Sequence, residues 1–148
     1  MKCSELALGW CAAALVACGP STPEPQDPVW GKQPCAHCAM VVDDRAHAAQ
    51  LVTEEGDRHY YDDIGCMLAW DAEQPRLAVV RWVRNPAAEL KAAGAAGWLD
   101  AERTAYRTDA QTPMDFGLEA AATGVDLTAA RAKVAARLLA PPAGGRHD

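Results

Sequence analysis

The sequence predicts a small mixed α+β domain with β-hairpins and short helices, preceded by a signal peptide and a proline-rich tether. Residues 46–53 and 58–61 contain strand-forming side chains and flank the turn Glu55-Gly56-Asp57, which predicts a β-hairpin. Residues 64–73 carry apolar side chains at three- and four-residue spacing, which is typical of an amphipathic helix. Residues 77–83 form a Val-rich run that predicts another strand. The chain has 148 residues, of which 50% are hydrophobic, enough for one domain with a substantial core.

The predicted helix over 64–73 has clear start and stop signals. Asp62 and Asp63 offer side-chain oxygens for an N-cap, and Pro75 cannot continue a helix. Shorter patterns predict the remaining elements: a helix or loop over 87–96, short strands at Trp98-Leu99 and Ala105-Tyr106, a helical run over 116–122, and a last helix from Asp126 or Thr128 to about Leu139, which Pro141-Pro142 stop.

The N-terminus predicts export and lipidation. Residues 6–17 form a short apolar segment after Lys2, the pattern of a secretory signal. The segment ends in Leu15-Val16-Ala17-Cys18, which is typical of a bacterial lipobox. We therefore expect the signal peptide 1–17 to be removed and Cys18 to carry a diacylglycerol anchor. The alternatives are a plain signal peptide or a buried apolar segment.

A proline-rich stretch is expected to separate the anchor from the domain. Five prolines fall within residues 18–34, and proline cannot continue a helix or a central strand, so this stretch is predicted to be an extended tether. The domain is then expected over residues 35–140, and the tail 141–148 is expected to be disordered. We expect the protein on the periplasmic side of a bacterial membrane, and Gly19 slightly favours the outer membrane.

Composition excludes several classes of function. The formal net charge is -6 and no basic stripe offsets it, so a nucleic-acid partner is not expected. The sequence has no run of 18 or more apolar residues for a transmembrane helix. It also has no Gly-rich phosphate loop and no Gly-x-Ser-x-Gly elbow. We therefore expect a binding protein rather than an enzyme.

Six consecutive residues, Cys35-Ala36-His37-Cys38-Ala39-Met40 (the hexapeptide), bring together two thiols, an imidazole and a thioether. Thiolate and thioether are soft donors that select Cu(I), whereas thiolates alone also suit Zn(II) or an iron–sulfur centre. Met40 favours copper, because zinc rarely takes a thioether. His37 is a weaker candidate ligand, since a loop histidine is usually solvated. The alternative interpretation is a redox or structural Cys-x-x-Cys pair with Met40 filling the core.

The mature domain contains an odd number of thiols. With Cys18 acylated, the domain keeps Cys35, Cys38 and Cys66, so at least one thiol stays free or binds a metal. Cys66 falls in the first turn of the predicted helix, where backbone N–H groups stabilise a thiolate, although a small buried cysteine is an equally good interpretation. Met67 lies on the apolar stripe and is expected in the core, with a weaker case as a ligand.

Three segments carry a family resemblance: the hexapeptide, residues 61–70 (Tyr-Asp-Asp-Ile-Gly-Cys-Met-Leu-Ala-Trp), and Trp98-Leu99-Asp100-Ala101 followed by Thr112-Pro113-Met114. In this order they resemble the NosL family, copper-binding lipoproteins that accompany nitrous oxide reductase. The family usually shows Cys-x-x-Cys-Gly-Met, an Asp-Ile-Gly-Cys-Met-Leu segment and Thr-Pro-Met. The resemblance covers roughly residues 15 to 125. It departs at Ala39 and Asp115, where the family usually has glycine.

The resemblance implies an exported lipoprotein that binds one Cu(I) and passes it on, in NosL towards nitrous oxide reductase. Its partner would be a copper-accepting cuproenzyme, or the assembly or transport machinery of that enzyme. Cys38 and Met40 fall on the motif most directly tied to copper, and Met114 or Cys35 is the candidate further ligand. The resemblance also implies a mixed α+β fold element shared with organomercury lyases.

Two other functions compete with a copper carrier. In one, Cys35 and Cys38 form the dithiol of an exported thiol-disulfide oxidoreductase, although no βαβ pattern surrounds them. In the other, the three cysteines and a histidine hold structural zinc in a small interaction module.

Overall fold

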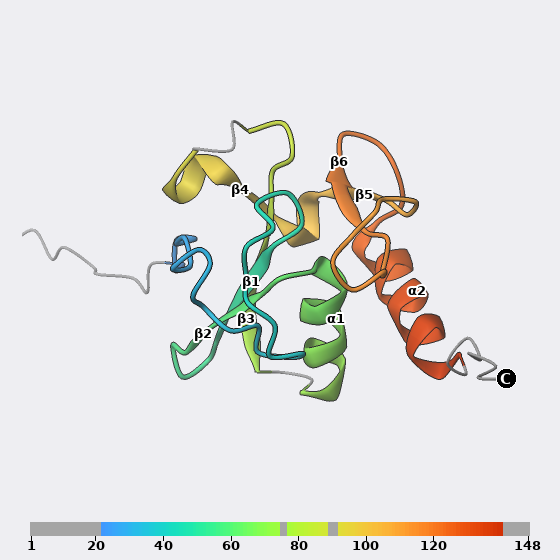
Figure 1. Ribbon diagram of the computed structural model, residues 1–148, viewed down its shortest axis with the longest axis horizontal. Helices are drawn as coiled ribbons and strands as arrows, with labels where there is room; N and C mark the ends of the chain where they lie inside the picture. Colours follow the sequence, from blue (N-terminus) through green and yellow to red (C-terminus); the bar gives the residue numbers. More distant parts are fainter. Residues whose placement is uncertain (1–21, 75–76, 89–91, 141–148) are drawn as a thin grey trace, which may run out of the picture.

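The computed structural model describes residues 22–74, 77–88 and 92–140. The predicted signal peptide, Cys18 and the predicted tail 141–148 lie outside the described residues. Within these ranges the protein has two α-helices, a four-stranded sheet and a two-stranded sheet (Figure 1). The predicted mixed α+β class is therefore confirmed. No helix in the described ranges is long and apolar enough to cross a membrane.

The larger sheet consists of β1 (Ala49–Thr53), β2 (Arg58–Tyr61), β3 (Ala78–Arg84) and β4 (Trp98–Asp100). Its order is β2-β1-β3-β4, and each neighbouring pair is antiparallel. The predicted hairpin is the β1–β2 pair, with Ala49 opposite Tyr61. All five residues of the central strand β1 are buried, which explains why this strand tolerates alanine where an alternating pattern is expected.

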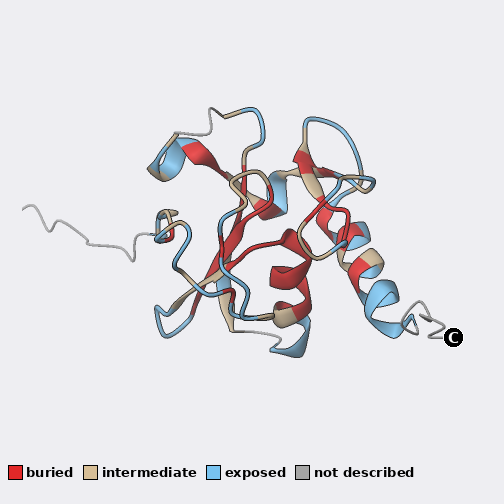
Figure 2. Cartoon of the chain, viewed as in Figure 1, coloured by how far each residue is buried: buried red, intermediate tan, exposed pale blue. Residues whose placement is uncertain are grey.

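Helix α1 (Ile64–Glu73) packs against this sheet and begins where the sequence predicts. Asp63 is the N-cap, and its Oδ1 accepts a hydrogen bond from the Gly65 N–H at 2.7 Å. Seven of the ten residues of α1 are buried, so the helix together with β1 forms the centre of the core (Figure 2).

The C-terminal part contains η1 (Gly94–Gly97), η2 (Ala101–Arg103), the strand pair β5 (Ala105–Arg107) and β6 (Glu119–Ala121), and helix α2 (Leu127–Leu139). Asp126, one of the two residues predicted to begin this helix, caps α2 by accepting from the Ala129 N–H at 2.8 Å. The predicted helical run over 116–122 is wrong, because residues 119–121 pair with β5 as a strand. A short alanine-rich segment has a weak local preference, and pairing with β5 overrides it.

The described part of the predicted tether lies against the sheet. Asp27 accepts a hydrogen bond from the Trp98 indole N–H at 2.9 Å, and the backbone of Gln26 exchanges two hydrogen bonds with the Gln50 side chain. Prolines remove backbone donors, so this segment is fastened by side chains and carbonyl groups rather than by a regular ladder. Residues 26 and 27 of the predicted tether are therefore held against the sheet.

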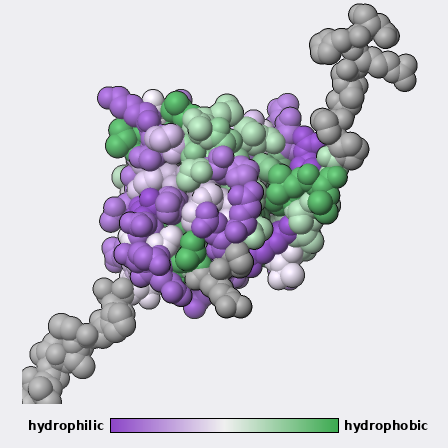
Figure 3. All heavy atoms as spheres, turned by 90° about the horizontal axis from the view of Figure 1, so that it is seen from below, coloured by the Kyte–Doolittle hydropathy of each residue, from purple (hydrophilic) through white to green (hydrophobic). Residues whose placement is uncertain are grey.

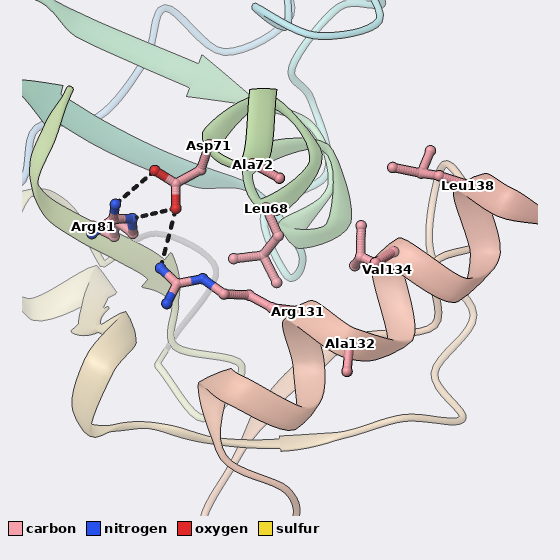
Figure 4. Close-up of a pocket in the computed structure, with 9 residues that line it drawn as sticks. Leu68, Asp71, Ala72, Arg81, Arg131, Ala132, Val134 and Leu138 are labelled. Atoms are coloured by element: carbon pink, nitrogen blue, oxygen red, sulfur yellow. Dashed lines mark hydrogen bonds and ion pairs between the residues drawn. The ribbon is translucent and has the colours of Figure 1, made fainter. Parts of the chain in front are cut away.

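Asp71 of α1 joins three elements. It accepts hydrogen bonds from Arg81 of β3 at 2.6 and 2.9 Å and from Arg131 of α2 at 3.1 Å (Figure 4). These charges lie at one side of a cavity of about 530 Å³ between α1 and α2, whose other lining residues include Leu68 and Val134. The network thus ties α2 to both α1 and β3.

His47 connects the segment before β1 to β6. Its Nδ1 lies 3.0 Å from Asp44 Oδ2 and its Nε2 lies 3.0 Å from Glu119 Oε2. Only the imidazolium can donate to both carboxylates, because neutral imidazole has one N–H. The hydrogen bond with Asp44 raises the pKa of His47 above its ordinary value, and this effect outweighs burial, which acts to lower it.

We expect the contribution of His47 to stability to be lost as the pH rises above about 6.5, the ordinary pKa of histidine. A raised folded-state pKa means that the stabilisation by His47 is complete below the unfolded-state pKa and is lost as the pH rises through the folded-state value. Urea unfolding at a series of pH values from about 6 to 9 measures this dependence. The stability difference between the wild type and His47→Gln should be largest at the acid end and shrink as the pH rises; a difference that does not change with pH contradicts the prediction.

Candidate metal centre

Three cysteines from two parts of the chain meet at one place. Cys35 and Cys38 belong to the hexapeptide, and Cys66 lies in the first turn of α1. Their sulfur atoms all lie within 4.8 Å of one another, and none of the three forms a disulfide. Metal–thiolate bonds of about 2.3 Å allow two sulfurs on one ion to be at most about 4.6 Å apart. Small side-chain rotations therefore suffice to bring these three sulfurs (the thiol cluster) onto one metal ion.

Backbone hydrogen bonds close the hexapeptide into a compact loop. The Cys35 N–H donates to the Met40 carbonyl at 2.7 Å, and the Ala39 N–H donates to the Cys35 carbonyl at 3.0 Å. The Ala36 N–H donates to the carbonyl of Tyr60 in β2 at 2.9 Å, which fastens the loop to the edge of the sheet. Because β2 leads directly into α1, the same attachment brings the loop to the N-terminus of that helix.

Two adjacent aspartates connect the surrounding loops to α1. Asp62 Oδ1 accepts from the backbone N–H groups of Asp43 at 3.1 Å and Asp44 at 3.3 Å. The fully buried Asp63 caps the helix and also accepts from the Met114 N–H at 3.0 Å. The loop that carries Met114 is therefore held at the same helix end as Cys66. The sequence predicted Asp63 as a cap but gave no signal for its bond to residue 114.

Cys35 has the lowest pKa of the three cysteines in the cluster. Its pKa is lowered to about 5, first because the Cys66 thiol donates to it, and further because the backbone N–H groups of Cys38, Asp62 and His37 point at its sulfur. These bonds outweigh burial, which acts in the opposite direction. Cys35 is therefore the sulfur of the cluster that loses its proton most readily.

The other two cysteines are thiols at neutral pH. The pKa of Cys66 is strongly raised, because its proton is held by the Cys35 sulfur and because the side chain is buried. Burial also raises the pKa of Cys38. A metal ion that binds all three sulfurs must displace two protons, so its affinity increases with pH.

The other candidate ligands lie at different depths. Met40 is 49% exposed and its backbone N–H points at the Cys38 sulfur, whereas Met114 is half-buried against the core. Met67 is fully buried, in keeping with the core position expected for it. His37 is half-buried and is not among the side chains that form the thiol cluster; its backbone N–H, rather than its ring, points at Cys35.

Two residues of these loops adopt the left-handed backbone conformation. Ala39 has a φ of 62° and Asp115 a φ of 57°, and they are the non-glycine residues with positive φ in the described part of the chain. Ala39 precedes Met40, and Asp115 follows Met114. These are the two positions at which the sequence departs from the glycines of the NosL pattern.

Ala39→Gly should stabilise the protein by about 0.5–1 kcal/mol. An L-residue in the left-handed region costs roughly 1–2 kcal/mol, and glycine in turn loses about 0.5–1 kcal/mol of unfolded-chain entropy on folding, so the relief of strain is the larger effect. Urea unfolding measures the difference. Ala36→Gly, an exposed position of the same loop that lacks positive φ, is the matched control and should destabilise. Equal effects of the two substitutions contradict the prediction.

The arrangement is compatible with metal binding, and two of its features differ from those of a typical thiol–disulfide exchange site or a four-ligand structural zinc site. The ionised sulfur, Cys35, is only 3% exposed, whereas a redox-active thiolate must reach a substrate disulfide. Among the His, Cys, Asp and Glu side chains of the described residues, the cluster contains three donors, and a structural zinc site requires four.

The cavity between α1 and α2 is a separate feature. Leu68, which lines it, follows Cys66 by two residues, so the two side chains leave the helix on roughly opposite sides. Figure 3 shows one face of the molecule, on which hydrophilic and hydrophobic residues gather in separate areas.

Comparison with known proteins gives no match: neither a protein-family model, nor a curated protein, nor a solved structure matches this chain. Function is therefore inferred from the chain's own residues and from the resemblance of its motifs.

Proposed function

We propose that this protein is an exported, lipid-anchored carrier that binds one Cu(I) ion and transfers it to a copper-accepting partner. The observation that carries the proposal is the thiol cluster, in which three sulfurs lie within 4.8 Å of one another and one of them, Cys38, accepts from the backbone N–H of the half-exposed Met40. Sulfur donors select Cu(I), and a monovalent ion needs only two or three of them.

Burial divides the cluster into an inner and an outer part. Cys35 is 3% exposed and Cys66 is fully buried, so this inner pair holds the ion away from water. Cys38 and Met40 form the outer part, which a partner's own sulfur ligand reaches first. Cu(I) then moves by ligand exchange from the inner pair through Cys38 to the partner, and no rigid four-ligand cage has to break.

The partner and the location follow from the sequence. The lipobox supports an anchor on Cys18 and a place on the periplasmic side of a bacterial membrane, and the NosL-like segments support delivery of copper for nitrous oxide reductase. The positive φ of Ala39 and Asp115 adds support to the resemblance, because glycine is the residue best suited to both positions.

Competition with a chromogenic Cu(I) chelator tests the proposal. The reduced protein should remove one equivalent of Cu(I) from the chelator, and Cys38→Ser should weaken the affinity by about tenfold or more, the scale on which changes around a metal site act. Met40→Leu keeps the volume but removes the thioether, so it should mainly slow transfer. Absence of Cu(I) uptake by the wild type, or an unchanged affinity in Cys38→Ser, overturns the proposal.

A further inference from the structure

The thiol cluster contains three thiols, whereas Cu(I) can be held by two sulfur donors. It presents three cysteine sulfurs, and no histidine or carboxylate joins them among the described residues. Two of the three are almost completely shielded from water. Their separation is fixed by hydrogen bonds of the hexapeptide to β2 and by the capped end of α1, so the three sulfurs are ordered before any ligand binds.

Charge distinguishes the ions that three thiolates can hold. With all three sulfurs deprotonated, Cu(I) leaves a doubly negative centre and Zn(II) a singly negative one, whereas a trivalent ion leaves a neutral one. The fully buried Asp63 is close enough to Cys66 to raise its pKa, and Asp62, 4% exposed, lies near Cys35. In the described part of the chain neither aspartate forms an ion pair; both are bonded to backbone N–H groups. A neutral complex is therefore the one that costs least to bury.

We propose that the thiol cluster also captures trivalent arsenic, supplied as arsenite, as a neutral tris-thiolate complex that blocks copper loading. Arsenic(III) forms three bonds in a pyramid and leaves its lone pair on the fourth side, so three sulfurs satisfy it completely. The inference uses the same sulfurs as the proposed copper function, but it does not require that function.

The reaction is an exchange of ligands and involves no oxidation. Arsenous acid, As(OH)₃, exchanges its three As–O bonds for three As–S bonds to Cys35, Cys38 and Cys66, and arsenic stays in the +3 state. Each leaving hydroxide takes one proton, either from a thiol or, for a sulfur that is already ionised, from solvent, and the three hydroxides depart as three water molecules.

Titration of the reduced protein with sodium arsenite tests the inference. The ultraviolet absorption of As–S bonds should increase until one equivalent of arsenite has been added and then stay constant. For each arsenic bound, the number of protein thiols that react with a thiol reagent should fall by three. Cys38→Ser should weaken arsenic binding by about 100-fold, because the third attachment acts intramolecularly. Circular dichroism verifies that the variant is folded, and Cys35→Ser supplies a second test of the same requirement.

Met40→Leu separates arsenic binding from copper transfer. A thioether is no ligand for arsenic(III), so this variant should bind arsenite like the wild type while it transfers Cu(I) more slowly. The inference is overturned if arsenite does not bind, if it consumes two thiols instead of three, or if it binds Cys38→Ser unchanged. Cu(I) titration of the same samples distinguishes the two proposals: copper uptake without arsenite binding defeats only this inference, and arsenite binding without copper uptake defeats only the carrier function.

Discussion

Replacing Cys66 with serine should weaken Cu(I) binding by at least about 100-fold, since even outer partners of a metal site contribute about 10- to 100-fold. Cys66 is one of the two inner sulfurs of the thiol cluster, and its side chain donates the hydrogen bond that is the main reason for the low pKa of Cys35. A serine hydroxyl can still donate this hydrogen bond, but its oxygen is a hard donor, so the variant loses a soft ligand. Competition titration with a chromogenic Cu(I) chelator at fixed pH measures the loss.

Met67→Leu is the matched control for this prediction. Met67 follows Cys66 in α1 and is also fully buried, so substitution there disturbs the same packing. A volume-conserving change of this kind costs less than about 1.5 kcal/mol of stability and should leave the Cu(I) affinity unchanged. If Met67→Leu weakens binding as much as Cys66→Ser does, the effect comes from packing, and Cys66 is no ligand.

Asp71→Ala should lower the free energy of unfolding by about 3 kcal/mol, because it leaves charged partners without their counter-ion in a site of low exposure. Asp71 is 7% exposed and is bonded to Arg81, whose side chain is 14% exposed, and to Arg131. In the variant the two guanidinium groups face each other with only Glu102 to neutralise them. Arg131 is 40% exposed and can turn to water, so the loss stays near the lower end for a buried pair. Urea unfolding followed by circular dichroism measures the change.

Glu73→Ala is the control on the same helix. Glu73 is an exposed residue of α1, and its replacement should change the stability by no more than about 0.5 kcal/mol. Asp71→Ala should also leave Cu(I) affinity intact while the protein is folded, because Cys66 and the cavity lie on different sides of α1. A stability change that is the same for both variants, or a loss of Cu(I) affinity in folded Asp71→Ala, contradicts this assignment.

Sequence patterns predicted correctly those helices and strands whose ends are set by residues close by in the chain. The helix 64–73 has an N-cap aspartate and a proline within two residues of its end, and the β1–β2 hairpin has a turn with glycine at its centre. The helical run over 116–122 failed because nothing in seven residues reveals the partner strand β5. The prolines before residue 35 predicted the absence of regular structure there, but not the hydrogen bond between Asp27 and Trp98.

In the candidate site, too, some features could be predicted from neighbouring residues and others depend on the tertiary structure. The sequence by itself determined the hexapeptide, the odd number of thiols and the place of Cys66 in a helical first turn, since spacing and composition are enough for each. Only the tertiary structure decided that Cys66 meets Cys35 and Cys38, that Cys35 is the ionised sulfur, and that Met40 is exposed while Met67 is buried. These facts depend on hydrogen bonds between residues such as Ala36 and Tyr60, which are distant along the chain and come together only when the sheet and α1 pack.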